Sequence, residues 1–128
     1  MHFCTDFLER LRVIFLDQHE YHEASELFLD ALEGNMHDQK VKDELVRISV
    51  VFCEFEQHEK SIELLTKVLQ ADRDHLEAKN EFVRISKIFE NQGSLDKSID
   101  LLMQVLRVDI THVKTKAALV KLAAQLTD

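Results

Sequence analysis

Proline and tryptophan are absent from this chain of 128 residues, and glycine occurs only twice. Proline and glycine form most turns of β-proteins, so their scarcity argues against a fold built from many short strands. Apolar residues instead recur three and four positions apart along most of the sequence, which is the spacing of amphipathic helices. Composition and spacing together predict an all-helical protein.

The two cysteines, Cys4 and Cys53, lie far apart in the chain and form no C-x-x-C pair. A disulfide framework or a zinc ribbon needs such pairs or more cysteines, so we expect two free thiols. No apolar run reaches the roughly 18 residues of a membrane helix, and the start of the chain has acids where a signal peptide is basic and apolar. These absences predict a cytoplasmic protein with no membrane partner.

Positive charge is in short supply. Lys and Arg number 16 against 24 Asp and Glu, which gives a formal net charge of -8. Nucleic-acid phosphates repel such a chain, so nucleic acid is not an expected partner. The length is sufficient for a single domain over residues 1–128 and too short for two domains of ordinary size.

One segment occurs twice in the sequence. Residues 44–52 read ELVRISVVF, and residues 81–89 read EFVRISKIF. When residues 43–79 are placed over 80–116 without a gap, 16 of 37 residues are identical, where unrelated sequences would share roughly two. The same offset gives nine identities between 6–42 and 43–79. The chain therefore contains three predicted repeats, 6–42, 43–79 and 80–116, followed by a capping helix over about 112–127.

Each repeat contains two predicted helices, of which the second reads HEASELFLDAL, EKSIELLTKVL or DKSIDLLMQVL. Gly93 and Ser94 mark a helix end followed by a helix start, and Asp74 with Glu77 has the spacing of a capping box. A helix pair of this length cannot bury its apolar side alone, so the pairs must stack.

Large apolar, small and aromatic residues recur in a fixed order. The second copy has Leu45, Ile48, Ser49, Phe52, Ser61, Leu65 and Val68. The third copy has Phe82, Ile85, Ser86, Phe89, Ser98, Leu102 and Val105. The first copy has Leu8, Leu11, Phe15, Ala24, Phe28 and Ala31. This order resembles the tetratricopeptide repeat over residues 5–126, and the resemblance implies a right-handed superhelical stack of antiparallel helix pairs. Because the repeated Ile and Phe are four residues apart, they share one helix face and are predicted to be core.

Three features depart from the family pattern. Arg12 replaces the small residue of the first helix, and the repeat has 37 residues where the family has about 34. The family's proline after the second helix is replaced by Met36, Arg73 and Ile110. We therefore expect looser packing in the first pair and longer second helices.

A column of cations recurs on the first helices, on a side that the predicted core does not use. The resemblance implies that this side lines a concave groove that holds a peptide of a partner protein. The expected peptide-binding residues are Arg10, Arg47, Arg84, Lys121, Val13, Val46, Val50, Val83 and Lys87. Acids gather instead on the second helices, at Glu20, Glu23, Glu26, Asp30, Glu59, Glu63, Asp96 and Asp100. The groove is thus expected to be locally positive within an acidic protein.

The same column has a plainer interpretation as ordinary helix surface. Asp43 precedes Arg47 by four residues, a spacing that gives an exposed ion pair of about a few tenths of a kcal/mol and needs no ligand. In the third copy Asn80 replaces the acid and Lys87 adds charge, which leaves Arg84 with fewer local partners, although Glu81 is within reach. Both interpretations stay open on the sequence alone.

Candidates for chemistry are few. His19 and His22 lie three apart among glutamates, a spacing that suits either a shared metal or a polar helix junction, and no further ligand is evident. His75 and His112 recur with the repeat and are expected in turns. The sequence has no phosphate-binding loop or nucleophile motif, so we expect neither catalysis nor a cofactor.

These observations predict an adaptor or chaperone-like module that binds an extended, acidic segment of another protein. The alternative is a structural unit that assembles with copies of itself. The residues that favour this alternative form an apolar cluster near the start of the chain, which no earlier repeat covers: Phe3, Cys4, Phe7 and Leu8. In that case we expect a homodimer through the N-terminal end, the other interpretation being that the first residues fold back over the cluster.

Overall fold

The computed structural model describes residues 18–126, which contain six α-helices and no strand. The helices are α2 (Gln18–Gly34), α3 (Gln39–Glu54), α4 (His58–Ala71), α5 (Leu76–Asn91), α6 (Leu95–Val108) and α7 (Val113–Leu126). The prediction of an all-helical protein is confirmed for these residues. The final helix, α7, lies where the sequence predicts the capping helix.

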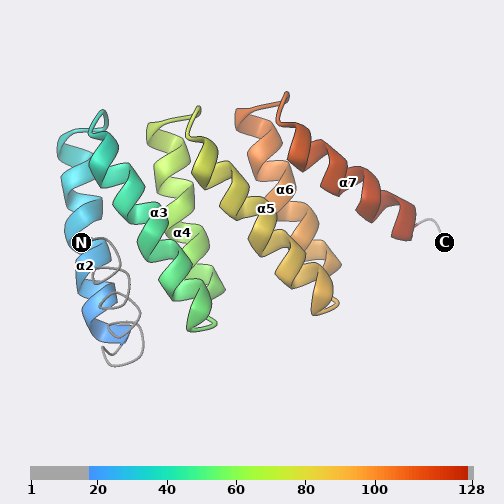
Figure 1. Ribbon diagram of the computed structural model, residues 1–128, viewed down its shortest axis with the longest axis horizontal. Coiled ribbons are helices and arrows are strands. Elements are labelled where there is room, and N and C mark those ends of the chain that lie inside the picture. The colour runs from blue at the N-terminus through green and yellow to red at the C-terminus, as the bar shows by residue number, and fades with distance from the viewer. Residues whose placement is uncertain (1–17, 127–128) are drawn as a thin grey trace, which may run out of the picture. The chain divides into compact units, whose positions relative to one another are not determined.

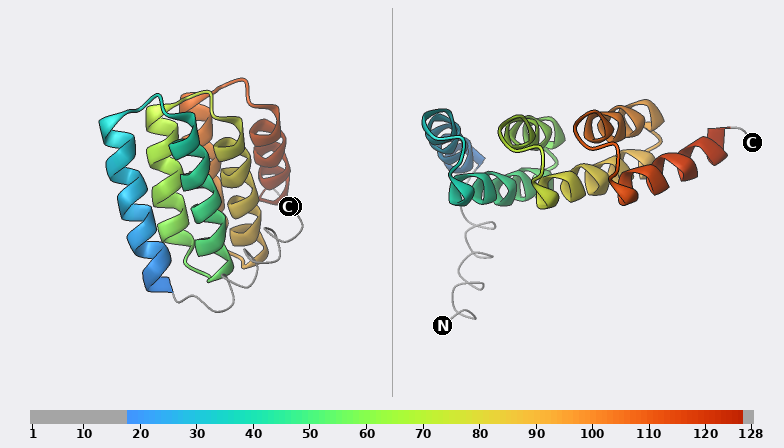
Figure 2. Two further views of the ribbon diagram at one scale, coloured as in Figure 1. Left: turned by 60° about the vertical axis from the view of Figure 1, so that its left-hand side comes forward. Right: turned by 90° about the horizontal axis from the view of Figure 1, so that it is seen from above.

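The chain divides into two compact units, with the boundary between Leu64 and Leu65 inside α4. In the first unit α2 runs antiparallel to α3, and in the second unit α5, α6 and α7 alternate in direction (Figure 1). Figure 2 shows that α5 and α7 of the second unit lie in one layer and α6 in another. Helices thus pack in neighbouring pairs, as expected for a helical repeat stack. A single domain over residues 1–128 stays a prediction.

The predicted core positions of the second and third copies are buried. In the first unit they are Leu45, Ile48, Ser49, Phe52 and Ser61, and in the second unit Leu65, Val68, Phe82, Ile85, Ser86, Phe89, Ser98, Leu102 and Val105. Each set occupies one side of its helix because the apolar residues recur three and four apart. The repeated apolar letters are therefore core residues, as predicted.

The first copy does not follow the predicted packing on its second helix. Ala31 is exposed, while Ser25 and Leu32 are buried on α2. The gapless alignment predicts burial at Ala24 and Ala31, and the buried residues each lie one position later. The pattern of burial on α2 is therefore rotated by one residue, which corrects the assignment of Ala24, Phe28 and Ala31 to the core.

Side-chain turns stand where the family would have proline. The backbone N–H groups of His37, Asp74 and Thr111 donate to the side-chain oxygens of Asn35, Asp72 and Asp109, at 3.1, 3.0 and 3.0 Å. These acceptors are 37 residues apart. An Asx turn of this kind closes the chain reversal without the fixed φ of proline.

The helix starts correct one detail of the sequence interpretation. Asp38 caps α3 by accepting from the backbone N–H groups of Lys40 and Val41, and His75 caps α5 by accepting from the N–H of Ala78. The cap of α5 is therefore His75 and not the predicted Asp74. Because His75 is also buried, it closes the helix end against the core.

The ends of α3 and α5 share one hydrogen-bond pattern. The N–H of Gln57 donates to the carbonyl of Phe52 at 2.9 Å, and the N–H of Ser94 donates to that of Phe89 at 2.8 Å. This pattern requires a left-handed residue just past the helix, and Gly93 supplies it with φ 81°. The prediction that Gly93 ends one helix and Ser94 starts the next is confirmed.

Candidate functional site

The cations of the column that fall within the described residues lie on α3, α5 and α7. Arg47 on α3, Arg84 on α5 and Lys121 on α7 are all exposed, and so is Lys87, one turn after Arg84. Arg10 and Val13 fall outside the described residues. The exposed acids predicted for the second helices are also present, at Glu20, Glu23, Glu26, Asp30, Glu59, Glu63, Asp96 and Asp100.

Both arginines form two-point ion pairs with a glutamate three residues earlier. Arg84 donates from Nε and Nη2 to the two carboxylate oxygens of Glu81, at 2.8 and 2.9 Å. Arg47 donates from Nε and Nη2 to Glu44, and Nε lies 3.1 Å from Oε2. The sequence had drawn attention to Asp43, four residues before Arg47, whereas these bonds engage Glu44. The planar guanidinium matches a carboxylate at two points, so each arginine is held in a fixed direction.

The predicted valines differ in how much surface they offer. Val46 on α3 is buried, while Val50 and Val83 are half-buried. Val120, at the corresponding position on α7, is 71% exposed. Apolar surface beside the cation column is therefore largest on α7.

Helix α7 differs from every other described helix because it contains no acid. Its charged residues are Lys114, Lys116 and Lys121. Ala118 occupies the position of Glu44 and Glu81, and no ion pair joins Lys121 to another described residue.

Exposed apolar side chains form a stripe along α7. They recur three and four apart at Val113, Ala117, Val120 and Ala124. Leu126, at the end of the same helix, is 57% exposed. The last helix thus presents both apolar surface and uncompensated positive charge.

A buried polar junction fixes α7 against α5 in the second unit. His112 Nδ1 lies 2.7 Å from the hydroxyl of Thr115, and its Nε2 lies 3.3 Å from Oδ1 of Asn80. Lys79 is almost fully buried and donates to Asp109 at 2.8 Å. Gln125 at the far end of α7 donates to Glu90 at 2.8 Å. These bonds set the α5–α7 face.

Two groups at this junction have shifted pKa values. The hydrogen bond from Lys79, aided by bonds from Thr111, holds the pKa of Asp109 well below its ordinary value. Burial lowers the pKa of His112, although the charge of Asp109 acts in the opposite direction. His112 is therefore a structural contact between α5 and α7 and not only the turn residue that its recurrence predicted.

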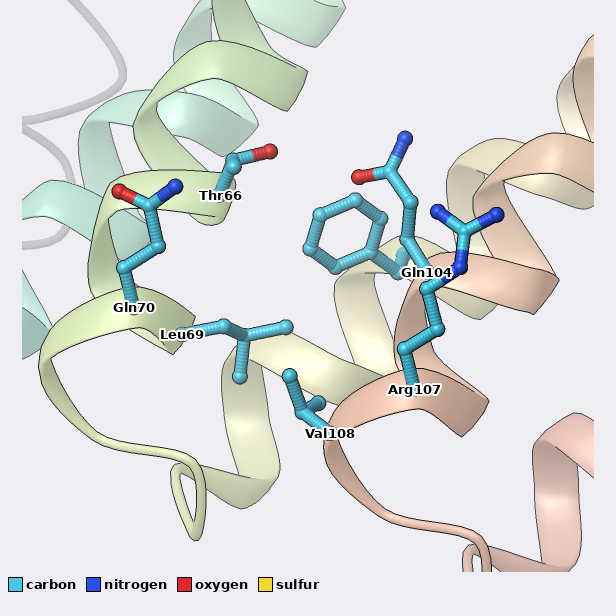
Figure 3. Close-up of a pocket in the computed structure, with 7 residues that line it drawn as sticks. Thr66, Leu69, Gln70, Gln104, Arg107 and Val108 are labelled. Carbon is cyan, nitrogen blue, oxygen red and sulfur yellow. The ribbon is translucent and has the colours of Figure 1, made fainter.

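A pocket of about 170 Å³ opens in the second unit and was not predicted from the sequence (Figure 3). Helices α4 and α6 form its walls, and one residue of α5 contributes to its floor. The lining residues are Thr66, Leu69, Gln70, Phe82, Gln104, Arg107 and Val108. None of them belongs to the cation column.

The other candidate sites from the sequence have little or no support among the described residues. The apolar cluster of Phe3, Cys4, Phe7 and Leu8 lies outside the described residues, as does the side chain of His19. Nε2 of His22 lies 3.9 Å from Glu26, and within residues 20–126 no three His, Cys, Asp or Glu side chains gather as a metal site would need. None of the helices seen here is long and apolar enough to cross a membrane.

No protein-family model matches the chain, and no curated protein is significantly similar to it. The resemblance to tetratricopeptide repeats therefore rests on the repeated residues themselves.

Proposed function

We propose that the protein is a binding module, an adaptor or chaperone-like protein of the cytoplasm, that holds an extended acidic segment of another protein. The segment contacts the exposed cations of α5 and α7 and the valines next to them. We propose that the protein binds without catalysing a reaction. We also propose that nucleic acid is not a partner, because the negative net charge of the chain repels phosphate backbones.

The observation that carries this proposal is the charge of the α5–α7 face. Arg84, Lys87 and Lys121 are exposed on it, in a protein whose net charge is -8. Val83 and Val120 lie beside them and offer apolar contact. A carboxylate of a ligand gains charge-assisted hydrogen bonds from these cations, whereas exposed acids outnumber cations on the second helices.

The Arg84 ion pair with Glu81 does not prevent this role. An exposed pair contributes about 0.2–1 kcal/mol, so a ligand carboxylate can share or replace Glu81 at little cost. Lys87 and Lys121 form no ion pair with another described residue, so their charge is directly available.

The test is a random peptide library selected on the wild-type protein. We expect enriched peptides with acids interleaved with apolar residues, and binding that weakens as salt rises. The double variant Lys87→Glu and Lys121→Glu should lose at least tenfold in affinity with unchanged circular dichroism. Lys67→Glu, an exposed lysine on α4, is the matched control and should bind as wild type. Enrichment of neutral peptides, or unchanged affinity of the double variant, would reject the proposal.

The exposed apolar stripe of α7 favours a second candidate function, self-assembly of the chain. A partner copy that covers Val113, Ala117 and Val120 would remove apolar surface from water. Light scattering at tens of micromolar decides between the two functions. A mass of two or more chains that falls to one chain in Val120→Glu would support assembly, and a wild-type monomer would exclude it under these conditions.

A further inference from the structure

The pocket between α4 and α6 has a floor that the core of the second unit holds in place. Phe82 and Leu69 form this floor, and both are almost fully buried, so their rotamers are fixed by packing. Val108, at the end of α6, closes the lower side (Figure 3). Because Phe82 and Leu69 belong to the core, this floor exists before any ligand arrives.

The size of the pocket limits what it accepts. Its volume of about 170 Å³ is close to that of apolar cavities of about 150 Å³ that take up benzene. One aromatic ring or one branched aliphatic side chain therefore fits. A larger apolar group would remain partly in water.

Polar groups surround the apolar floor. Thr66 and Gln70 stand on α4, and Gln104 and Arg107 stand on α6 (Figure 3). The two residues of α6 are three positions apart, so their amide and guanidinium groups project from the same side of the helix. Both groups donate hydrogen bonds, and together they suit a carboxylate.

Arg107 differs from the other described arginines. Arg47 and Arg84 are held by glutamates, and Arg73 donates to the carbonyl of Val108 at 3.2 Å. No hydrogen bond or ion pair joins Arg107 to another described residue. Its place in the last turn of α6 is favourable for a cation, by about 0.3–1 kcal/mol, but this interaction leaves the guanidinium donors unused.

We propose that this pocket binds a peptide segment of a partner protein that inserts one aromatic or branched side chain and places the carboxylate of a neighbouring Asp or Glu against Arg107 and Gln104. The apolar floor binds the side chain, and the donors on α6 bind the acid. The site is made by α4 and α6, so it is separate from the α5–α7 face and does not depend on it.

The test uses capped dipeptides as probes, followed by NMR of labelled methyl groups. Acetyl-Phe-Asp-amide should shift the signals of Leu69 and Val108 and saturate in the millimolar range. Acetyl-Phe-Asn-amide and acetyl-Ala-Asp-amide, which lack the acid or the ring, should each bind at least threefold more weakly. Arg107→Gln should abolish the preference for Asp over Asn, whereas the control Lys67→Gln, an exposed lysine of α4, should retain it.

Several outcomes would overturn the proposal. The absence of shifts at Leu69 and Val108, equal binding of the Asp and Asn probes, or an Asp preference that survives in Arg107→Gln would each do so. If 3-phenylpropionate binds at least tenfold more tightly than the dipeptide, the site is one for small acids and the peptide assignment is wrong. Shifts only at Val83 and Val120 would support the α5–α7 face and reject this pocket.

Discussion

The turn after α3 and the turn after α5 have the same backbone and different residues. In each, the second residue after the C-terminal end of the helix is left-handed, at φ 63° for Glu56 and φ 81° for Gly93. Glycine adopts this conformation freely, whereas an L-residue with a side chain adopts it at a cost of about 1 kcal/mol or more. The stacked helices therefore dictate the turn, and Glu56 is strained by a geometry that Gly93 adopts without strain.

The core residues next to these turns differ in their surroundings. Phe52 on α3 is fully buried, whereas Phe89 on α5 is 6% exposed and has the ammonium of Lys97 at 5.6 Å from its ring centre. The helices thus use one residue type at one repeat position in two environments. Differences in stability between equivalent variants measure those environments.

The largest expected effect is the loss of either phenylalanine ring. Phe52→Ala and Phe89→Ala should each lower the free energy of unfolding by about 3–5 kcal/mol, with the larger loss for Phe52, whose ring is completely enclosed. Denaturant titration followed by circular dichroism gives both values. Leu27→Ala, which removes a side chain that is 70% exposed, is the control and should change stability by less than about 0.5 kcal/mol. A larger loss for Phe89 would contradict this ranking.

The next largest effect concerns the two left-handed turn residues, whose substitution should change stability in opposite directions. Gly93→Ala should destabilise by about 1–2 kcal/mol through its left-handed φ alone, because no atom lies within 4 Å of the added Cβ. Glu56→Gly should stabilise by about 0.5 kcal/mol, since the relief of strain exceeds the extra chain entropy of glycine. Gly34→Ala, at a glycine without this φ, serves as control and should not destabilise. Loss of stability in Glu56→Gly would show that the turn is not strained.

A third comparison concerns the residues that precede the N-terminal ends of the helices. His112 precedes α7 where Asp38 precedes α3, and burial lowers the pKa of His112 below 6.5. The unfolded chain therefore binds the proton first, so stability is fully present above about pH 6.5 and falls as the pH drops below it. The charged groups that face His112 are Asp109, Lys79 and Lys114.

The measurement is stability as a function of pH between about 7 and 5. His112→Asn should flatten the decline, because asparagine cannot take up a proton in this range and still offers a side-chain acceptor for the helix end. His37→Asn, at an exposed histidine, is the matched control for the substitution itself. A slope that is equal in wild type and in His112→Asn would assign the pH dependence to other groups.

The helical class and most buried positions of these regions followed from the spacing of apolar residues. One helix face carries the repeated isoleucines and phenylalanines, and this face is buried when the helices stack. The residues are Ile48, Phe52, Ile85 and Phe89. The burial on α2 was missed because a gapless alignment cannot show a one-residue rotation. Ser25 lies 36 residues before Ser61, one residue less than the repeat length. An alignment with a one-residue gap would therefore have paired these two serines.

The polar junction and the pocket were harder to foresee. Lys42, Lys79 and Lys116 recur at the last position of each repeat, but buried lysines are rare, so their recurrence alone gives no reason to expect Lys79 in the interior. The partner of Lys79 is Asp109, 30 residues away, and their contact exists only after α5 and α6 have packed. The pocket likewise combines three helices, and no periodicity within one helix encodes their joint shape.

Substitution of two pairs of serines by alanine should change stability by a smaller amount, with opposite signs for the two pairs. Ser61 and Ser98 are buried on α4 and α6, and their hydroxyls have no hydrogen-bond partner among the described residues. Ser49 and Ser86 donate instead to a carbonyl three residues earlier, at 2.5 and 2.7 Å. Alanine should stabilise by up to about 1 kcal/mol at Ser61 and Ser98, and destabilise by about 0.5 kcal/mol at Ser49 and Ser86. Thermal melts rank the four variants, and a destabilised Ser98→Ala would reveal an unseen partner such as water.

The last prediction concerns the arginine pairs, and it bears on function. A double-mutant cycle of Arg84→Gln with Glu81→Gln should give a coupling of about 0.5–1 kcal/mol, and the cycle of Arg47 with Glu44 somewhat less. The difference follows from Glu81, which is 17% exposed against 35% for Glu44, because a less hydrated carboxylate interacts more strongly. Both couplings should shrink at high salt. Values this small leave each guanidinium available to the carboxylate of a ligand, since a ligand bond to arginine contributes as much as the pair it displaces. A coupling above about 2 kcal/mol in either cycle would show that the arginines are held by their own helices, and the cation column would then be structural.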